Sequence, residues 1–308
     1  MSETKDNLGF GNKYNENERR LFNKDGSLNV KKKGVIKGTK DIFIYLIEMS
    51  WSKFLLLLLG SFFLLNILFA LVYFFIGVEN LNGVMPGSSL ENYLSCLHFS
   101  SQTFTTVGYG AISPTGIVVN LIASTEAMTG LLSFSLATGL LFGRFSRPNL
   151  KLKFSENILI SDYKKNDGKG LMFKVSNKRN TILLDTSVEI IATTFFINNE
   201  GEISRDFQVL DLEIKEIKIF PSAWTVVHPI NSDSFFYKNT LEELKEKNLE
   251  ILVMIKSHDE TFGQTIHART SYKGDEIIEN ANFIKSSVLN KDGIVEVDIS
   301  KIGDFVKK

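Results

Sequence analysis

Residues 101–110 read SQTFTTVGYG, and they lie between the two longest apolar stretches of the chain. The first stretch, 54–76, carries no charged residue, and the second, 117–142, carries only Glu126. A helix needs roughly 20 apolar residues to cross the bilayer core, so both stretches predict membrane spans. A buried helix of a soluble protein is the alternative for the first stretch, but such helices normally keep a polar face.

The segment between the two predicted spans is too short and too polar to cross the membrane itself. Residues 90–104 have the apolar spacing of a half-length helix, and the Thr/Gly-rich residues 105–110 follow directly. Irregular backbone at membrane depth is tolerated where it is buried in protein or lines an aqueous path. This re-entrant segment therefore predicts a pore.

The sequence TVGYG at 106–110 suits the dehydration of potassium ions. Backbone carbonyls of four equivalent loops can replace the hydration shell of K⁺, and TVGYG is the well-known filter sequence of potassium channels. Gly108 and Gly110 permit backbone conformations that a Cβ would forbid. One such segment per chain requires four chains, so a homotetramer is expected. Bound K⁺ is expected at the carbonyls of four residues: Thr106, Val107, Gly108 and Tyr109.

Composition excludes several other classes of protein. The chain has 35 Lys and Arg against 35 Asp and Glu, so its net charge gives no indication of nucleic-acid binding, and no nucleic-acid partner is expected. Its single cysteine, Cys96, permits neither an intrachain disulfide nor a cysteine-rich metal site. The sequence has no nucleotide-binding glycine motif and no nucleophile paired with a base. Neither an enzyme nor an organic cofactor is therefore expected.

Basic residues flank the two predicted spans but are missing from the connection at 77–116. The positive-inside rule then places both termini in the cytoplasm, and we expect a multi-pass protein of the cell membrane. The first fifty residues are polar, so a cleaved signal peptide is not expected. The basic residues are Lys31, Lys32, Lys33, Lys37, Lys40 and Lys53 before the first span, and Arg144, Arg147, Lys151 and Lys153 after the second.

The stretch 39–50 has apolar residues at helical spacing from Ile42 to Met49, and Trp51 follows it. An amphipathic helix that ends in tryptophan is typical of the membrane interface. We therefore expect a short helix lying along the inner membrane surface. The alternative is that this stretch extends the first span.

From Lys151 onward the hydrophobic period changes to two. The runs 212–215, 249–255 and 295–299 alternate apolar and polar residues, and Asn, Gly and Asp separate such runs. This pattern predicts an antiparallel β-sandwich. Within it, 241–247 is the one stretch that predicts a helix.

Several motifs together resemble the prokaryotic branch of the inward-rectifier potassium channel family. Residues 20–30 (RLFNKDGSLNV) are similar to its N-terminal strand, 101–110 to its pore helix and filter, and 138–148 (TGLLFGRFSRP) to its inner-helix end and linker. The stretches 223–228 (AWTVVH) and 264–272 (QTIHARTSY) resemble signature stretches of its cytoplasmic domain. The filter is common to potassium channels, whereas the other motifs are specific to this family.

The resemblance implies a membrane α-helical two-span pore domain joined to a cytoplasmic all-β immunoglobulin-like sandwich, assembled as a homotetramer. The expected parts are a cytoplasmic N-terminal segment at 1–38, an interfacial slide helix at 39–50, a pore domain at 51–148 and the sandwich at 149–308. Within the pore domain we expect spans at about 52–77 and 116–145, a pore helix at about 90–104 and the filter at 106–110.

The resemblance also assigns roles to residues of the second span. Phe142 falls where the family has an apolar constriction that gates the pore, and a packing phenylalanine is the alternative. Gly130 and Gly139 are candidate hinges, although close helix packing explains such glycines equally well.

Charged and polar residues complete the predicted site. Gln102 and Glu126 are expected to support the filter, and Asp185 falls at an acidic position of the family's cytoplasmic pore. Juxtamembrane basic residues attract anionic lipid headgroups. The residues expected to do so are Lys53, Arg144, Arg147, Lys151 and Arg179.

Phe134 stands where strong rectifiers carry an acidic residue that binds polyamines. Because phenylalanine cannot attract a cation by charge, we expect weak rather than strong rectification, with polyamines and divalent cations as candidate blockers. The sequence leaves two alternatives open: a two-span cation channel with another type of regulation, and a non-conducting sensor anchored in the membrane.

Overall fold

The computed structural model describes residues 20–30, 39–146, 151–163, 168–197, 201 and 203–308. The chain divides into two compact units. The helical unit is Gly34–Arg147, and the β-unit combines Met1–Lys33 with Pro148–Lys308. Each unit has a hydrophobic core of its own.

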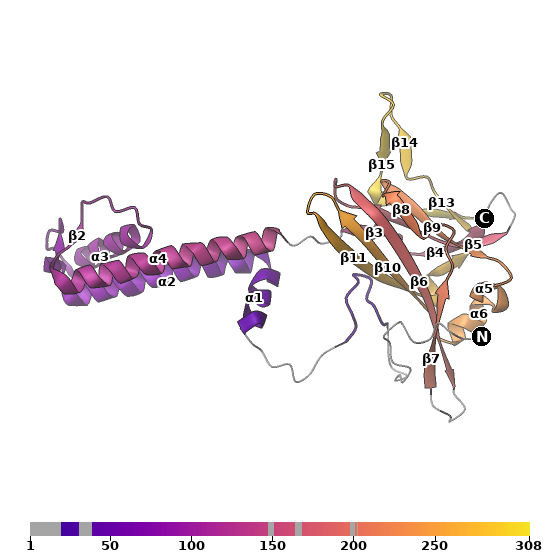
Figure 1. Ribbon diagram of the computed structural model, residues 1–308, viewed down its shortest axis with the longest axis horizontal. Helices are drawn as coiled ribbons and strands as arrows, with labels where there is room; N and C mark the ends of the chain where they lie inside the picture. The colour runs from indigo at the N-terminus through magenta and orange to yellow at the C-terminus, as the bar shows by residue number, and fades with distance from the viewer. Residues whose placement is uncertain (1–19, 31–38, 147–150, 164–167, 198–200, 202) are drawn as a thin grey trace. The chain divides into compact units, whose positions relative to one another are not determined.

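Two long helices, α2 (Trp51–Ile76) and α4 (Gly116–Phe145), run side by side in the helical unit (Figure 1). Within the described part of the chain, these are the two helices long and apolar enough to cross a membrane. Most of their residues are exposed in the isolated chain. A core helix of a soluble protein would instead be mostly buried, so the structure agrees with two membrane spans.

Two shorter helices lie at opposite ends of the long pair (Figure 1). These are α1 (Thr39–Glu48) and α3 (Ser89–Phe104). The start of α3 is fixed by a capping box: the Ser88 side chain accepts from the Glu91 amide, and the Glu91 carboxylate accepts from the Ser88 amide at 2.8 Å. This exchange satisfies two donors that a helix start leaves unpaired.

A two-stranded ladder joins the segments that precede and follow α3. Strand β1 (Leu81–Asn82) pairs with β2 (Ser113–Pro114), next to the 3-10 helix η1 (Val78–Asn80). Gly83 has a φ of 86° and lies so close to the Ala111 carbonyl that a Cβ would overlap it. Only glycine fits there, and the loop that precedes β2 thereby approaches the residue that follows β1.

Two five-stranded sheets make up most of the β-unit among the residues that the structure describes. The first has the order β11 (Gln264–Lys273), β10 (Glu250–Asp259), β6 (Leu183–Ile197) and β7 (Ile203–Leu210), and β8 (Glu216–Ile219) also pairs with β6. The second has the order β12 (Ile277–Glu279), β4 (Ile158–Asp162), β5 (Lys169–Asn177) and β3 (Leu152–Phe154), and β9 (Ala223–Ile230) also pairs with β5.

The core of the β-unit takes side chains from both sheets. Phe173 and Val175 of β5 belong to the same buried cluster as Ile190 of β6 and Ile251 and Val253 of β10, and all five are at most 1% exposed. Burial of alternate positions from two sheets is the packing of a β-sandwich. The all-β sandwich predicted for this part of the chain is therefore present.

Smaller elements surround the two sheets. β13 (Ala281–Phe283) pairs with β16 (Phe305–Lys307), and β14 (Ser287–Leu289) pairs with β15 (Val295–Val297) in a hairpin that projects from the sheets (Figure 1). The short helices are α5 (Phe235–Lys238), α6 (Leu241–Glu246), η2 (Gly274–Glu276) and η3 (Ile299–Lys301).

Four details of the sequence prediction are wrong. The run 212–215 is not a strand but part of the connection between β7 and β8, in which Leu212 is buried and the other three residues are exposed. β15 ends at Val297 because the Asp298 side chain caps η3. Helix α5 was not expected, and the Ser234 side chain caps it. Finally, β4 pairs with β12 in parallel, one exception within the predicted antiparallel sandwich.

The N-terminal segment 20–30 packs on the β-unit, although it is distant in sequence. Leu21 and Phe22 form a buried cluster with Ile191 of β6 and Leu252 of β10. These two strand residues lie on the sheet face opposite the main core, because neighbouring residues of a strand point to opposite faces. The segment therefore covers apolar surface that the sandwich leaves open.

A buried acid fixes the register of this segment. The two carboxylate oxygens of Glu250 share the Leu21 amide as donor, at 2.9 and 3.1 Å. The same carboxylate lies 3.6 Å from the guanidinium of Arg205, and both side chains are almost fully buried. A buried carboxylate needs such partners, since it has no access to water.

The Glu250→Ala variant is expected to destabilise the β-unit, because it removes the carboxylate that the buried Arg205 faces. Breaking a buried ion pair at one partner costs about 3–5 kcal/mol. For a unit of this size that corresponds to a lowering of Tm by roughly 6–20 °C. Thermal unfolding of the purified full chain, followed by circular dichroism, measures this loss.

The matched control is Glu246→Ala, which removes an exposed acid in the same part of the chain. It should melt close to the parent protein, because exposed charges contribute little. Equal melting of the two variants would contradict the role given to Glu250.

Candidate functional site

The predicted filter is attached to the C-terminal end of α3 through its own backbone. The Thr106 amide donates to the Thr103 carbonyl at 3.0 Å. The amides of Val107 and Gly108 both donate to the Gln102 carbonyl, at 3.0 and 3.3 Å. The last carbonyls of a helix have no partner within the helix, so the filter supplies donors that this end requires.

The filter backbone alternates in conformation. Thr106, Gly108 and Gly110 have positive φ values of 58°, 56° and 80°, and the two residues between them do not. Such alternation turns successive peptide groups so that their carbonyls lie along one side of the chain. A threonine in the left-handed region is strained, and proteins keep such strain mainly at functional sites.

Glu126 joins the three helices that hold the filter. Its side chain is completely buried in α4. One carboxylate oxygen accepts from the Tyr73 hydroxyl of α2 at 2.6 Å, and the other accepts from the Ser100 hydroxyl of α3. The Ser100 hydroxyl also lies 3.1 Å from the Asn66 carbonyl of α2. These contacts fix α3 between the two long helices.

Gln102, the other predicted support residue, contacts the filter through its main chain. Its carbonyl is the acceptor for two filter amides, as described above. The side-chain Oε1 is buried and has no hydrogen-bond partner among the described residues. In the isolated chain the support therefore comes from the backbone at this position rather than from the amide side chain.

The two candidate hinge glycines of α4 have different surroundings. Gly130 lies against the end of α3, where a Cβ would overlap the Phe104 carbonyl. At Gly139, a Cβ would have no described atom within 4 Å. Close packing thus explains the glycine at position 130, whereas the structure offers no packing reason for the one at 139.

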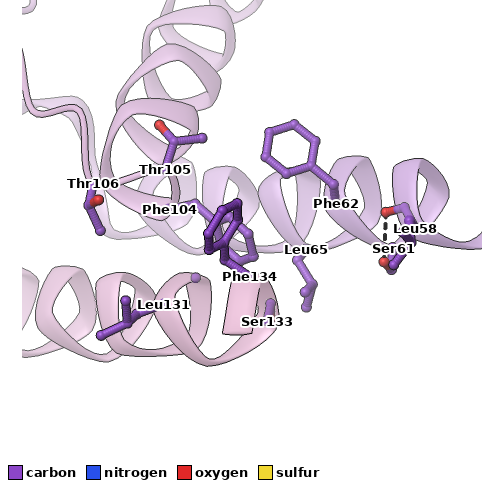
Figure 2. Close-up of a pocket in the computed structure, with 11 residues that line it drawn as sticks. Leu58, Ser61, Phe62, Leu65, Phe104, Thr105, Thr106, Leu131, Ser133 and Phe134 are labelled. Carbon is purple, nitrogen blue, oxygen red and sulfur yellow. Dashed lines mark hydrogen bonds between the residues drawn. The ribbon is translucent and has the colours of Figure 1, made fainter. Parts of the chain in front are cut away.

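A pocket of about 560 Å³ lies between α2, the end of α3 and α4 (Figure 2). Phe62 of α2 and Phe104 of α3 line it, with their rings edge to face at 5.7 Å. Thr106 of the filter and Phe134 of α4 also line it. None of the described residues around the pocket is ionisable, so the surface next to Phe134 carries no charge that would hold a cation.

Phe142, the predicted gate residue, lies in the last turns of α4 and is 72% exposed in the isolated chain. A large aromatic side chain with so little contact inside its own chain is free to meet other chains or the ion path. The packing alternative requires neighbours that the described residues of the helical unit do not supply at this position.

The predicted lipid-binding residues are divided between the two units. Lys53 is exposed at the start of α2, whereas Arg144 in α4 is turned toward main-chain carbonyls. Lys151 precedes β3 and Arg179 follows β5, and the pairing of these strands brings the two residues to the same end of the sheet. Arg147 lies outside the described residues.

Asp185, the predicted cytoplasmic-pore acid, lies in an irregularity of β6. It has a φ of 43°, and the pairing of β6 with β10 shifts register beside it. Its carboxylate lies 3.1 Å from the ammonium group of Lys218, which also pairs with Glu216 at 2.7 Å. The hydrogen bonds that the Lys218 ammonium donates to Glu216 and to Asp185 raise the pKa of Lys218, so the positive charge persists beside Asp185.

The sequence did not identify the partners of these residues. A single acid in a predicted membrane span indicates that hydrogen-bond donors surround it. Its donors, Tyr73 and Ser100, lie on two other helices, and their distance from Glu126 in the sequence follows no pattern that would identify them. The partners of Arg144 are carbonyls, which every residue carries. Only the folded structure brings these groups together.

Comparison with known protein families gives two matches along this chain. The description "Inward rectifier potassium channel C-terminal domain" matches residues 152–307, and "Ion channel" matches residues 61–147. Both agree with the predicted fold class, a two-span pore domain followed by an all-β domain.

Individual proteins show the same similarity over almost the whole chain. "Inward rectifier potassium channel Kirbac3.1" of Paramagnetospirillum magnetotacticum is 34% identical over 94% of this chain and 96% of its own. "G protein-activated inward rectifier potassium channel 2" of Rattus norvegicus is 28% identical over 91% of this chain and 70% of its own. "ATP-sensitive inward rectifier potassium channel 11" of Oryctolagus cuniculus is 26% identical over 96% and 80%.

The Gly130→Ala variant is expected to destabilise the helical unit, because the added Cβ overlaps the Phe104 carbonyl. Overpacking of this kind costs about 1–3 kcal/mol. The matched control is Gly139→Ala, which meets no described atom and replaces glycine by a better helix former. Heat-induced loss of helical signal from the full chain measures both variants. A Gly130→Ala protein that is as stable as the control would refute the packing role.

Proposed function

The chain belongs to the inward-rectifier potassium channel family, and from this premise we propose that four copies surround one ion path and conduct K⁺ through a shared filter. Its relatives are ion channels rather than enzymes. The observation that carries the proposal is the alternating backbone of 106–110, held by the carbonyls at the end of α3. One chain supplies one row of carbonyls, and a dehydrated K⁺ needs oxygens on all sides.

The exposure of the filter supports assembly into a tetramer. Val107 is 53% exposed and Tyr109 is 78% exposed in the isolated chain. Side chains of this size next to a filter need packing partners, because a loose filter could not keep its carbonyls at fixed distances. In the proposed tetramer, neighbouring copies supply these partners, and K⁺ binds at the carbonyls of the four residues 106–109.

The two units would then have separate tasks in conduction. The spans and filter within 51–148 cross the membrane, with the helix at 39–50 lying along its inner surface. The β-unit from 149–308 extends the ion path on the cytoplasmic side, where both termini lie. The absence of Lys and Arg from 77–116 supports this orientation.

The gate of the proposed channel is a ring formed by Phe142 from each copy. Four aromatic rings at a narrow point exclude water, and a dry constriction stops ions. Gly139 lies one helical turn earlier and has free space around its Cα, which suits a hinge. Gly130 is assigned to packing instead, because it contacts the end of α3.

Rectification of the proposed channel is weak. Phe134 places an aromatic ring where an acid would hold a blocking polyamine, and none of the described residues around the pocket beside it is ionisable. Asp185 carries an acidic charge, but Lys218 lies 3.1 Å from it and competes with any cation from solution. Polyamines and divalent cations would accordingly block with low affinity.

Anionic lipids are the proposed regulators. Lys53 is exposed at the start of α2, and Lys151 is exposed just before β3. Arg147 and Arg179 complete the proposed contacts with headgroups. Each basic side chain near an anionic membrane surface contributes about 1 kcal/mol of attraction.

Flux through liposomes tests the conduction proposal. Purified chain in vesicles should take up rubidium or potassium, exclude sodium and be inhibited by barium, because its filter replaces the hydration shell of K⁺ and not that of the smaller ion. At both voltage polarities, single-channel currents recorded with spermine should differ little from those recorded without it. Equal sodium and potassium flux would contradict the proposal, and no flux in any lipid composition would favour a membrane-anchored sensor.

The Phe142→Ala variant is expected to raise open probability or conductance several-fold, because alanine leaves a wider and wetter constriction. The matched control is Leu136→Ala, which truncates another exposed apolar side chain of the same helix. Single-channel recording with symmetric potassium distinguishes the two. If both variants conduct like the parent, Phe142 is a packing residue.

A further inference from the structure

The Arg144 side chain ends at the backbone of α1. Its Nη1 donates to the carbonyls of Leu46 at 2.7 Å and Ile47 at 2.9 Å, and its Nη2 donates to the Met49 carbonyl at 2.7 Å. Helix α1 ends at Glu48, so the Leu46 and Ile47 carbonyls belong to its last turn and have no partner within the helix, and Met49 follows directly. A cation also matches the partial negative charge at a helix C-terminus.

The same guanidinium contacts two aromatic rings that pack edge to face with each other. Its Cζ is 4.6 Å from the ring centre of Trp51 and 4.5 Å from that of Phe54, both in the first turn of α2. The Trp51 ring in turn lies 5.2 Å from the ring of Phe145 in α4. One side chain of α4 therefore contacts the end of α1 and the start of α2 together.

A glycine allows α4 to approach α1 this closely. A Cβ at Gly143 would lie 3.1 Å from the Ile47 Cδ1 and 3.7 Å from the Phe43 ring. Both contacts belong to α1, and the first is tighter than ordinary van der Waals distance. Helices α1 and α4 are therefore in close contact at Gly143 as well as through Arg144.

We propose that Arg144 is a positioning residue for the gate. Through its contacts, the end of α1 and the first turn of α2 determine where the end of α4 lies. Phe142 lies two residues earlier on the same helix, so a helix end held by Arg144 fixes the orientation of that ring. This role rests on the proposed gate at Phe142. It replaces the direct headgroup contact that the sequence suggested for Arg144.

The chemistry of arginine distinguishes the two roles. The guanidinium is a planar fork that reaches several carbonyls and stacks on rings, whereas the ammonium of lysine is a compact point charge. The long-range attraction of a basic side chain to an anionic membrane surface comes from its charge, and lysine keeps that charge. A fork between three carbonyls and two rings cannot be reproduced by lysine.

The test compares Arg144→Lys with the parent chain, each as full-length protein in vesicles of phosphatidylcholine with increasing phosphatidylglycerol. Single-channel recording gives open probability, and the lipid titration gives its midpoint. We expect the open-to-closed ratio to change roughly tenfold at every lipid composition, with an unchanged midpoint and unchanged K⁺ selectivity. The control Lys53→Gln removes an exposed charge and should move only the midpoint.

A second variant, Trp51→Leu, keeps the charge of Arg144 and removes one of the two aromatic rings that the guanidinium contacts. It should change open probability in the same direction as Arg144→Lys, and the double variant should change it by less than the product of the two effects. This non-additivity is not expected of two unrelated losses of stability.

Parent-like open probability in Arg144→Lys would overturn the role of Arg144 in gating, as would a shift confined to the lipid midpoint. Both outcomes presuppose a conducting parent chain. A parent that carries no current would instead contradict the proposed function, and the role of Arg144 would fail with it.

Discussion

A carboxylate within a membrane helix has to be hydrogen-bonded, because lipid offers it no water. In this chain Glu126 meets that constraint with hydroxyls from two other helices, Tyr73 in α2 and Ser100 in α3. Helix α3, the proposed pore helix, is thereby fixed in depth and rotation between α2 and α4. Since amides of the proposed filter bond to the end of that same helix, the alternating backbone of 106–110 depends on where this acid is buried.

Features that depend on local sequence could be predicted. An uncharged run long enough to cross a bilayer becomes α2, and the filter sequence follows a short helix as expected. The alternating run beginning at Leu249 becomes β10, because its side chains pack on the core of the sandwich. In these cases the residues that form an element also carry the signal for it.

Features that depend on distant partners could not be predicted in this way. The run 212–215 alternates like a strand, yet only Leu212 reaches the core. Single main-chain hydrogen bonds to β9 and β6, at Glu213 and Lys215, take the place of a continuous ladder. The choice of Gly130 over Gly139 as a packing residue depends on the Phe104 carbonyl, which is contributed by another helix. Arg144 has the sequence context of a lipid-binding cation, and only the position of α1 gives it different partners.

Two of the charged groups described above hold the N-terminal part of the chain by its main chain. Glu250 accepts from the Leu21 amide, and Arg144 donates to the carbonyls at the end of α1. Main-chain groups are the same for every residue, so these bonds would survive many substitutions in the segments they hold. The charged partners have no such freedom, because a buried amide or a helix end needs an acceptor or donor of the right kind and reach. The specificity of both attachments therefore resides in Glu250 and Arg144 rather than in the N-terminal sequence they bind.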